Sequence, residues 1–221
     1  MQYQSIDEYL KFWLGEATDP ELCKPADYFC GRMKEFSRER NVSGCVVMLG
    51  DSLTDFAGDW KKYLPGWDVV NRGIAGDMIE GMELRLDEVA SLHPSHLYVL
   101  AGCNNFVKHP SASAEDVWPI YRHFLDSIKA TLPGVPLHII SLLPMHSICP
   151  DYPSFNLKAE KMNVLLKKAA PRYGYEYVDL AEQLMDEEGN LKMEYTVDGC
   201  HLSEAGFRIW ADLMMKTKQE K

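Results

Sequence analysis

Residues 45–55 read CVVMLGDSLTD and decide which fold the chain adopts. The first part, 45–49, is a short and continuously apolar run, which is typical of a strand buried on both faces of a parallel sheet. Ser52 follows this strand at the start of a turn. A serine there projects its hydroxyl over the carboxyl edge of the sheet, where α/β proteins bind ligands. A serine in a turn or at a helix N-cap is the ordinary alternative, so Ser52 alone defines no site.

Apolar runs alternate with amphipathic stretches along the whole chain, and no internal repeat or linker-like segment interrupts them. Further strands are predicted at residues 68–71, 97–101, 137–142 and 175–179. Helices are predicted at 20–40, 78–92, 114–132, 155–173 and 203–216. This alternation predicts an α/β fold with a doubly wound sheet. We expect one domain over residues 1–221, with residues 1–40 as an N-terminal helical extension packed on it.

The composition limits the classes of function. Hydrophobic residues make up 46% of the 221 residues, as in an ordinary globular domain. The formal net charge is −10 at pH 7, and an acidic surface repels phosphate backbones and anionic membranes. We therefore expect a small-molecule substrate that is neutral or weakly charged, and no nucleic-acid partner.

The N-terminal sequence has no basic stretch followed by an apolar run and a cleavage site, and no run of about 18 apolar residues occurs anywhere. These observations favour a cytoplasmic protein without a membrane span, although a signal peptide removed upstream would leave no trace. Six cysteines are too few for a disulfide scaffold at this length. Cys45 and Cys103 are expected to be buried free thiols, and a Cys23–Cys30 bridge is the weaker alternative. Cys103, Cys200 and His201 do not have zinc-motif spacing.

Three further loops carry residues suited to acyl chemistry. Gly73, after the second strand, allows a close backbone approach and can aim an N–H at a substrate. Asn104, after the third strand, can donate a hydrogen bond to an oxyanion. Asp198 lies three residues before His201, so its carboxylate can fold onto the imidazole and orient it as a base. Each loop also has an ordinary interpretation as a turn or helix cap. Together they supply a nucleophile, oxyanion donors, a base and an acid at one sheet edge.

Four blocks resemble the SGNH hydrolase superfamily, also called the GDSL esterase/lipase family: GDSLTD at 50–55, the Gly73 loop, GCNN at 102–105 and DGCHLSEAG at 198–206. The resemblance implies a three-layer α/β/α, flavodoxin-like sandwich with a central five-stranded parallel sheet. It also implies Ser52 as nucleophile, His201 as base and Asp198 as its orienting acid, with no metal or cofactor. The implied oxyanion donors are the N–H groups of Ser52 and Gly73 and the Asn104 side chain. Asn105 departs from the pattern, because relatives often have an acid there.

The sequence says less about the substrate. No long apolar lid is present, which favours a small acyl group such as acetyl, with a carbohydrate as one candidate alcohol. A lysophospholipase, a thioesterase or an acyltransferase of the same fold stays open, as does a non-catalytic ligand-binding module. A flavodoxin-like nucleotide domain is disfavoured because no phosphate-binding glycine motif follows the first strand. Substrate contacts are tentatively expected from Asp51, Asn105 and His146, with the aromatic segment 145–155 as a wall. A homodimer through the N-terminal helices is compatible with the sequence.

Overall fold

A computed structural model describes residues 5, 8–9, 20–39, 43–150 and 152–219 of the chain. Five parallel strands form one sheet in the order β2-β1-β3-β4-β5. The strands are β1 (Val46–Gly50), β2 (Val69–Gly73), β3 (His96–Leu100), β4 (Leu137–Ile140) and β5 (Glu176–Val178). Each predicted strand is present, so the predicted five-stranded parallel sheet is confirmed. The first crossover runs to one side of β1 and the second to the other, and this switch lies at the end of β1.

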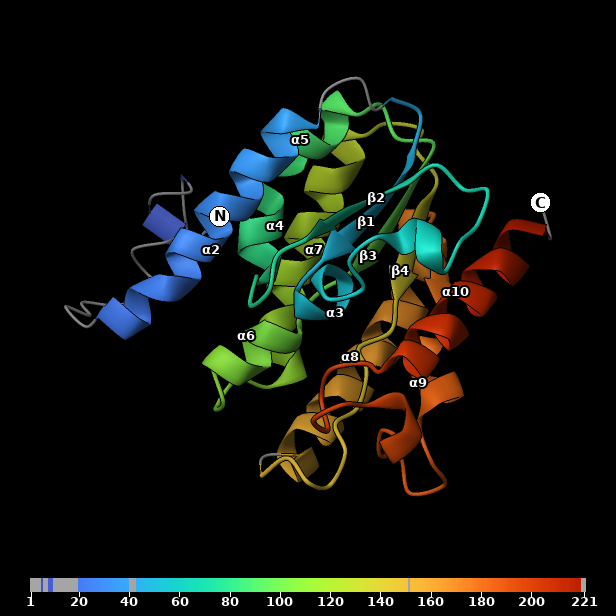
Figure 1. Ribbon diagram of the computed structural model, residues 1–221. Coiled ribbons are helices and arrows are strands. Elements are labelled where there is room, and N and C mark those ends of the chain that lie inside the picture. Colours follow the sequence, from blue (N-terminus) through green and yellow to red (C-terminus); the bar gives the residue numbers. More distant parts are fainter. Residues whose placement is uncertain (1–4, 6–7, 10–19, 40–42, 151, 220–221) are drawn as a thin grey trace.

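Alternate side chains of the strands enter two separate cores. Val47 and Leu49 of β1 belong to the larger core, whereas Val46 and Met48 belong to the other. Every residue of β1 is buried, which explains its continuous apolar sequence. Layers of helices cover both faces of the sheet, as Figure 1 shows. The predicted three-layer α/β/α architecture is therefore confirmed.

The helices that build these layers are α2 (Pro20–Arg38), α3 (Ser52–Asp55), α4 (Ile79–Leu84), α5 (Leu86–Ser91), α6 (Cys103–Lys108), α7 (Ala114–Thr131), α8 (Tyr152–Tyr173), α9 (Leu180–Leu184) and α10 (Glu204–Gln219). The described residues also contain two 3₁₀ turns, η1 (Trp60–Lys62) and η2 (Met193–Tyr195). Residues of α4, α5, α7 and α8 fill the larger core, and residues of α9 and α10 fill the other. Among the described residues, no helix has both the length and the apolar character needed to cross a bilayer.

The helix predicted at 78–92 is divided into α4 and α5 at Arg85, which leaves the helical conformation with φ −113° and ψ 15°. Its buried guanidinium donates to Asp77 Oδ2 at 3.0 Å, to the Arg72 carbonyl at 2.8 Å and to the Gly50 carbonyl at 3.2 Å. The break therefore coincides with an arginine that satisfies backbone carbonyls near the ends of β1 and β2.

The N-terminal helix α2 packs on the loop after β2. Phe29 and Phe36 form a small apolar cluster with Tyr9, Ile74 and Met78. Figure 1 shows α2 lying beside α4 and α5. The thiol of Cys30 is free, and the side chain of Cys23, its partner in the alternative bridge, lies outside the described residues. Most of the predicted N-terminal extension before α2 lies outside the described residues.

Candidate active site

Ser52 is the first residue of α3, which begins directly after β1. Asp51 caps this helix, because its side chain accepts a hydrogen bond from the Leu53 N–H at 3.0 Å. A side chain at Gly50 would lie 2.1 Å from Thr54 Oγ1 in α3 and 2.9 Å from the Leu100 carbonyl oxygen in β3, so glycine allows the close approach of these elements. The turn leaves Ser52 partly exposed at the carboxyl edge of the sheet.

A row of hydrogen bonds joins Ser52 to two residues almost 150 positions away. His201 Nε2 lies 3.0 Å from Ser52 Oγ, and His201 Nδ1 lies 2.6 Å from Asp198 Oδ2. The other carboxylate oxygen of Asp198 accepts from the N–H groups of Cys200 at 2.9 Å and His201 at 2.7 Å. The structure therefore brings these three sequence-predicted residues together. When a hydroxyl, an imidazole and a carboxylate lie in this order, the imidazole can take the proton of the hydroxyl as its oxygen attacks an electrophile.

The loop that carries Asp198 and His201 is fixed by its own backbone and by Thr196. The Thr196 hydroxyl donates to the His201 carbonyl at 2.8 Å and accepts from the Gly199 N–H at 2.8 Å. His146 donates its backbone N–H to the Gly199 carbonyl at 2.7 Å. These contacts hold the imidazole in place although Asp198 itself is exposed.

Partial burial of Asp198 raises the pKa of its carboxyl, but the hydrogen bonds from the His201 side chain and from two backbone N–H groups outweigh this effect. The resulting pKa is lowered to about 2. Asp198 is therefore a carboxylate at neutral pH, as a residue that stabilises an imidazolium must be.

The predicted oxyanion role of Gly73 conflicts with its contacts. Its N–H donates to Asn71 Oδ1 at 2.7 Å and is therefore already occupied. A side chain at position 73 would lie 2.2 Å from the Asp55 backbone nitrogen, so this glycine serves the close packing of β2 against α3. The expectation that Gly73 donates to an oxyanion is therefore corrected: Gly73 allows β2 to pack closely against α3.

Gly76 lies three residues later in the same loop. It lies in a turn closed by the Asp77 N–H and the Ile74 carbonyl at 3.0 Å, and its φ of +80° favours glycine. Its N–H has no acceptor among the described residues. Asn104 Nδ2 donates to the neighbouring Asp77 carbonyl at 2.9 Å, which leaves one amide hydrogen for another acceptor. The sequence does not distinguish Gly76 from Gly73, because the positive φ of Gly76 is seen only in the structure.

Two of the tentative substrate contacts are also corrected, because both side chains are shut off from solvent. Asp51 is 1% exposed and caps α3. Asn105, also 1% exposed, accepts from the Ile79 N–H at 3.1 Å and donates to Glu80 Oε2 at 2.8 Å. Asn105 therefore fastens the start of α6 to α4.

The aromatic segment 145–155 contributes less to the site than expected. Phe155 is buried in the larger core, with its ring edge-on to Phe106, so it lines no substrate pocket. His146 is half-buried, and its Nδ1 accepts from the Ile148 N–H at 3.2 Å. The aromatic ring that does lie against His201 is Phe56, at 4.9 Å between centroids, and it is 52% exposed.

A pair of cysteines flanks the site, one beside Asn104 and one beside His201. The Cys103 thiol hydrogen-bonds to Cys200, which raises the pKa of Cys103 and lowers the pKa of Cys200. Both thiols are free. Within the described ranges, no three His, Cys, Asp or Glu side chains gather as metal ligands do.

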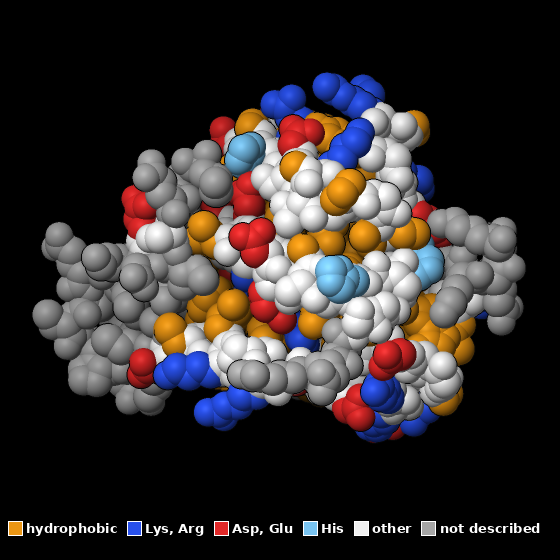
Figure 2. All heavy atoms as spheres, turned by 90° about the horizontal axis from the view of Figure 1, so that it is seen from above, with side chains coloured by type: hydrophobic (Ala, Val, Ile, Leu, Met, Phe, Trp, Pro, Cys, Tyr) orange, Lys and Arg blue, Asp and Glu red, His pale blue; other side chains and the backbone are white. Residues whose placement is uncertain are grey.

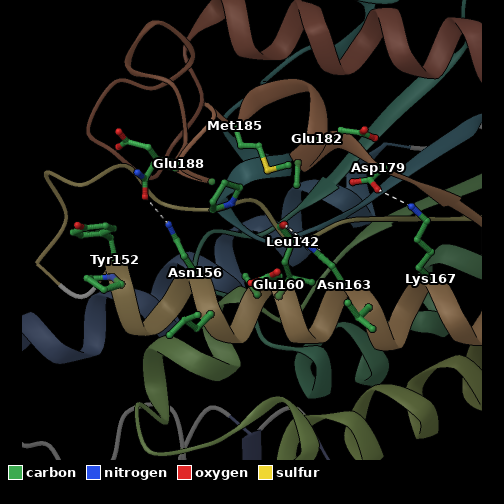
Figure 3. Close-up of a pocket in the computed structure, with 18 of the residues that line it drawn as sticks. Leu142, Tyr152, Asn156, Glu160, Asn163, Lys167, Asp179, Glu182, Met185 and Glu188 are labelled. Carbon is green, nitrogen blue, oxygen red and sulfur yellow. Dashed lines mark hydrogen bonds and ion pairs between the residues drawn. The ribbon is translucent and has the colours of Figure 1, made fainter.

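A cavity of about 850 Å³ lies elsewhere, between α8 and the segment that follows β5 (Figure 3). None of Ser52, Asp198 and His201 lines it. Two of its three amide side chains have backbone partners: Asn163 bonds both backbone groups of Leu142, and Asn156 bonds Met145 in the same way. These contacts anchor α8 to the residues after β4 and indicate a structural role.

The strand order and the helical layers define a three-layer α/β/α protein of flavodoxin-like order. The chain belongs to the GDSL-like lipase/acylhydrolase family, whose model matches residues 48–209. This family acts on ester bonds.

Solved structures support the same fold. A Streptococcus pneumonia protein named for platelet activating factor is 21% identical, with a TM-score of 0.75 over 88% of this chain and 94% of that one. A GDSL-like lipase from Bacteroides thetaiotaomicron is 20% identical, with a TM-score of 0.72 over 89% and 98%. A mutant acetyl-xylooligosaccharide esterase from Geobacillus Stearmophilus is 16% identical, with a TM-score of 0.59 over 79% and 94%. Curated protein sequences give no match.

Proposed function

We propose that the protein is a serine esterase that cleaves small acyl esters, preferably acetyl esters, through an acyl-enzyme on Ser52. The observation that carries this proposal is the hydrogen-bonded row from Asp198 through His201 to Ser52 Oγ. Membership of an ester-hydrolase family supports the reaction class. The intact row argues against a non-catalytic ligand-binding module.

In the proposed reaction Ser52 Oγ attacks the ester carbonyl carbon while His201 Nε2 takes the hydroxyl proton. Asp198 stabilises the imidazolium that forms. His201 then gives this proton to the departing alkoxide, and the acyl group remains on Ser52. In the second half, His201 takes a proton from water, the resulting hydroxide attacks the acyl-enzyme, and Ser52 Oγ regains its proton as the leaving group.

The negative charge that develops on the carbonyl oxygen needs fixed donors. Ser52 supplies a backbone N–H at the first position of α3, where helical N–H groups lack intrahelical partners. We assign the second donor to the Gly76 N–H, in place of Gly73, and the third to Asn104 Nδ2. The three donors come from the loops after β1, β2 and β3, which are adjacent strands.

The preference for a small acyl group rests on the surroundings of His201. Phe56 lies against the imidazole, and Ile148 lies close to Gly199 in the same loop, so both can bound an acyl pocket. Both are about half exposed, at 52%, and an open apolar rim of this kind suits a short acyl chain better than a long one. A sugar remains our preferred alcohol, and the similarity in fold to an acetyl-xylooligosaccharide esterase is consistent with it.

The test is hydrolysis of p-nitrophenyl acetate and p-nitrophenyl butyrate by wild type, Ser52→Ala and Ser111→Ala. Ser111 is exposed and serves as the matched control. We expect Ser52→Ala to lose at least about 10³-fold in kcat while Ser111→Ala keeps wild-type activity. Equal activity in Ser52→Ala and wild type would exclude Ser52 as nucleophile and favour the binding module. A higher kcat/KM with butyrate would refute the acetyl preference alone.

A further inference from the structure

The residues before β1 make polar contacts with the loop that carries the proposed oxyanion donor Gly76. This loop comprises Gly73, the last residue of β2, and residues 74–78. Arg32 and Tyr9 contact it directly, and Tyr28 is linked to it through the Asp55 carboxylate. None of these three residues belongs to the blocks that resemble the family. We propose that they are positioning residues, which hold the 73–78 loop in the conformation needed for oxyanion stabilisation. The proposal rests on the proposed esterase function.

The first contact is at the beginning of the loop. Arg32 of α2 donates through Nε and Nη2 to the Gly73 carbonyl, at 3.3 Å each. Its Nε also lies 3.4 Å from Asp55 Oδ1, and its guanidinium stacks over the Phe36 ring at 4.8 Å. The Arg32 side chain is only 19% exposed, so these interactions are weakly screened by solvent. One cation therefore ties together α2, the end of β2 and the end of α3.

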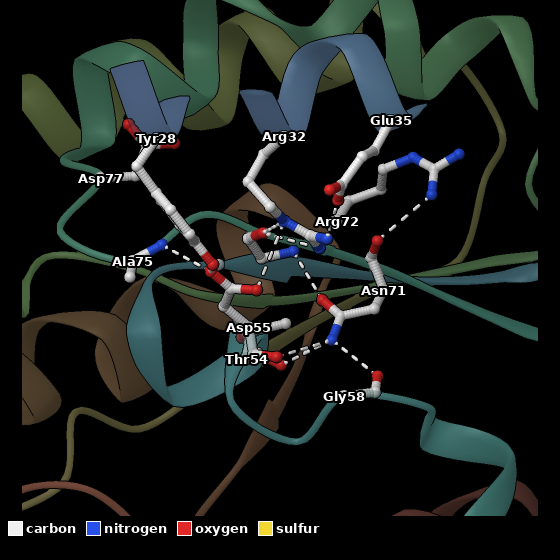
Figure 4. A network of polar contacts seen from close by, with 12 residues as sticks. Tyr28, Arg32, Glu35, Thr54, Asp55, Gly58, Asn71, Arg72, Ala75 and Asp77 are labelled. Carbon is white, nitrogen blue, oxygen red and sulfur yellow. Dashed lines mark hydrogen bonds and ion pairs between the residues drawn. The ribbon is translucent and has the colours of Figure 1, made fainter. Parts of the chain in front are cut away.

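The second contact is in the middle of the loop and passes through Asp55. Tyr28 donates its hydroxyl hydrogen to Asp55 Oδ2 at 2.7 Å, and the same oxygen accepts from the Ala75 N–H at 2.9 Å. Figure 4 shows Tyr28, Asp55 and Ala75 meeting at this carboxylate, next to Arg32. Asp55 is the last residue of α3, which begins at Ser52. The carboxylate thus links the helix that carries Ser52 to the residue immediately before Gly76.

The third contact is at the end of the loop. Tyr9 donates its hydroxyl hydrogen to Asp77 Oδ1 at 2.9 Å and accepts from the Met78 N–H at 3.0 Å. Asp77 Oδ2 is bonded to Arg85, and the Asp77 carbonyl accepts from Asn104. Tyr9 and Asp77 are both 0% exposed, so this contact is buried as well as fully hydrogen-bonded.

Positions 73, 75 and 77–78 are thus each fixed, and Gly76 lies between two of them. A glycine at φ +80° has no side chain to hold it, so its N–H direction depends on its neighbours. An oxyanion donor is effective only if it is aimed before the reaction begins. The N-terminal segment supplies that constraint from outside the sheet.

Tyr28→Phe is the sharpest test, because Tyr28 is 42% exposed and phenylalanine keeps its ring. We expect kcat for p-nitrophenyl acetate to fall roughly 3- to 10-fold with KM unchanged, since one hydrogen bond to Asp55 is lost. Affinity for a trifluoromethyl ketone, which forms a tetrahedral adduct with serine, should fall by a similar factor. Arg32→Gln should behave likewise, and Arg32→Lys, which keeps a cationic donor, should recover part of the loss. Tyr173→Phe, at the end of α8, is the matched control.

Hydrogen–deuterium exchange provides a readout that does not depend on turnover. The Ala75 N–H, bonded to Asp55, should exchange faster in Tyr28→Phe than in wild type or Tyr173→Phe. Unchanged kcat and unchanged exchange in Tyr28→Phe would overturn the positioning role while the esterase assignment stands. A lower melting temperature with wild-type kcat would show a purely structural contact and would also overturn it. If wild type and Ser52→Ala hydrolyse the ester equally, both proposals fall together.

Discussion

Asn104 and Asn105 are neighbours in the sequence, yet their side chains make different kinds of hydrogen bond. Asn104 is half-buried and reaches the carbonyl of the 73–78 loop, whereas Asn105 is buried between Ile79 and Glu80. An amide that can still donate to a ligand affects turnover, and an amide whose bonds are all internal affects folding. Substitutions at these two adjacent positions should therefore affect different properties, turnover at Asn104 and stability at Asn105.

We expect Asn104→Ala to lower kcat by about 10²–10³-fold, the scale seen when one oxyanion donor is removed. Asn105→Ala should instead lower the free energy of unfolding by about 1–3 kcal/mol, because the Ile79 N–H and the Glu80 carboxylate lose their partner. Esterase assays and urea titrations of both variants check this. The reverse outcome, with Asn105→Ala the less active and Asn104→Ala the less stable, would exchange the two assignments.

The pH dependence of Asp198 follows from its lowered pKa of about 2. The Asp198 carboxyl stays ionised above about pH 4, so protonation of Asp198 does not contribute to any loss of activity between pH 7 and pH 5. Asp198→Asn should reduce kcat at every pH from 6 to 9, by roughly 10²–10⁴-fold, because the imidazolium loses its counter-charge. The measurement is a pH–rate profile, with Asp126→Asn on the exposed side of α7 as control. A loss of only a few-fold would mean that another group orients His201.

At the scale of elements, the strands were predictable because a strand buried on both faces has a continuously apolar local sequence, as in β1. α3, α6 and α9 were missed because four to six residues are too few to display a helical period. The loop after β2 contains two glycines, and the sequence alone does not tell which one needs a positive φ. The hydrogen bond from the Gly73 N–H to Asn71, seen in the structure, distinguishes the roles of the two glycines.

Gly73 and Gly31 offer a matched pair of glycine substitutions. Gly73→Ala should destabilise the protein by several kcal/mol, because the new methyl group would lie 2.2 Å from the backbone of α3. Gly31→Ala on α2 meets no atom within 4 Å and should stabilise the fold by up to about 1 kcal/mol through helix propensity. Thermal unfolding of the two variants checks this. A Gly73→Ala protein with wild-type stability would reopen the assignment of this glycine to packing.

The buried carboxyl of Asp51, which caps α3, makes the stability of the fold depend on pH. Burial raises the pKa of Asp51 to about 7, above the value of about 3.9 for an unfolded chain. The folded state therefore holds this proton more tightly, and stability is lost as the pH rises from about 4 through 7. Asp51→Asn removes this loss of stability. The melting temperature of the variant minus that of wild type should therefore be larger at pH 8.5 than at pH 5. Asp59→Asn, at the exposed cap of η1, is the control, and a difference that is independent of pH would contradict the expectation.

At the scale of the whole molecule, the contacts between α2 and the site could not be predicted from the sequence. Tyr28 meets Asp55 across 27 residues and Arg32 meets Gly73 across 41, and neither pairing has a local signature. The pairing of His201 with Ser52 across 149 residues was predicted because both lie on loops expected at one sheet edge, and the family resemblance then supplied their roles. Sequence patterns describe which face each element buries, whereas long-range polar contacts depend on how the finished layers meet.

The net charge of −10 belongs to the whole molecule and affects substrate encounter more than chemistry. On the face drawn in Figure 2, acidic and basic side chains are interspersed with apolar ones, so the charge is spread over the surface there. A diffuse field of this kind acts over a Debye length, which is about 30 Å at 0.01 M salt and about 3 Å at 1 M. Anionic substrates should therefore be disfavoured at low salt and neutral ones unaffected.

Three acetate or succinate esters of different charge test this prediction: neutral p-nitrophenyl acetate, anionic mono-p-nitrophenyl succinate and cationic acetylcholine. Between 10 mM and 500 mM sodium chloride, kcat/KM should stay constant for the first, rise for the second and fall for the third, because salt screens repulsion and attraction alike. Comparing each ester with itself at two salt concentrations removes differences in intrinsic reactivity. If the anionic ester is instead hydrolysed less efficiently at high salt, basic side chains near Ser52 dominate the local field over the net charge.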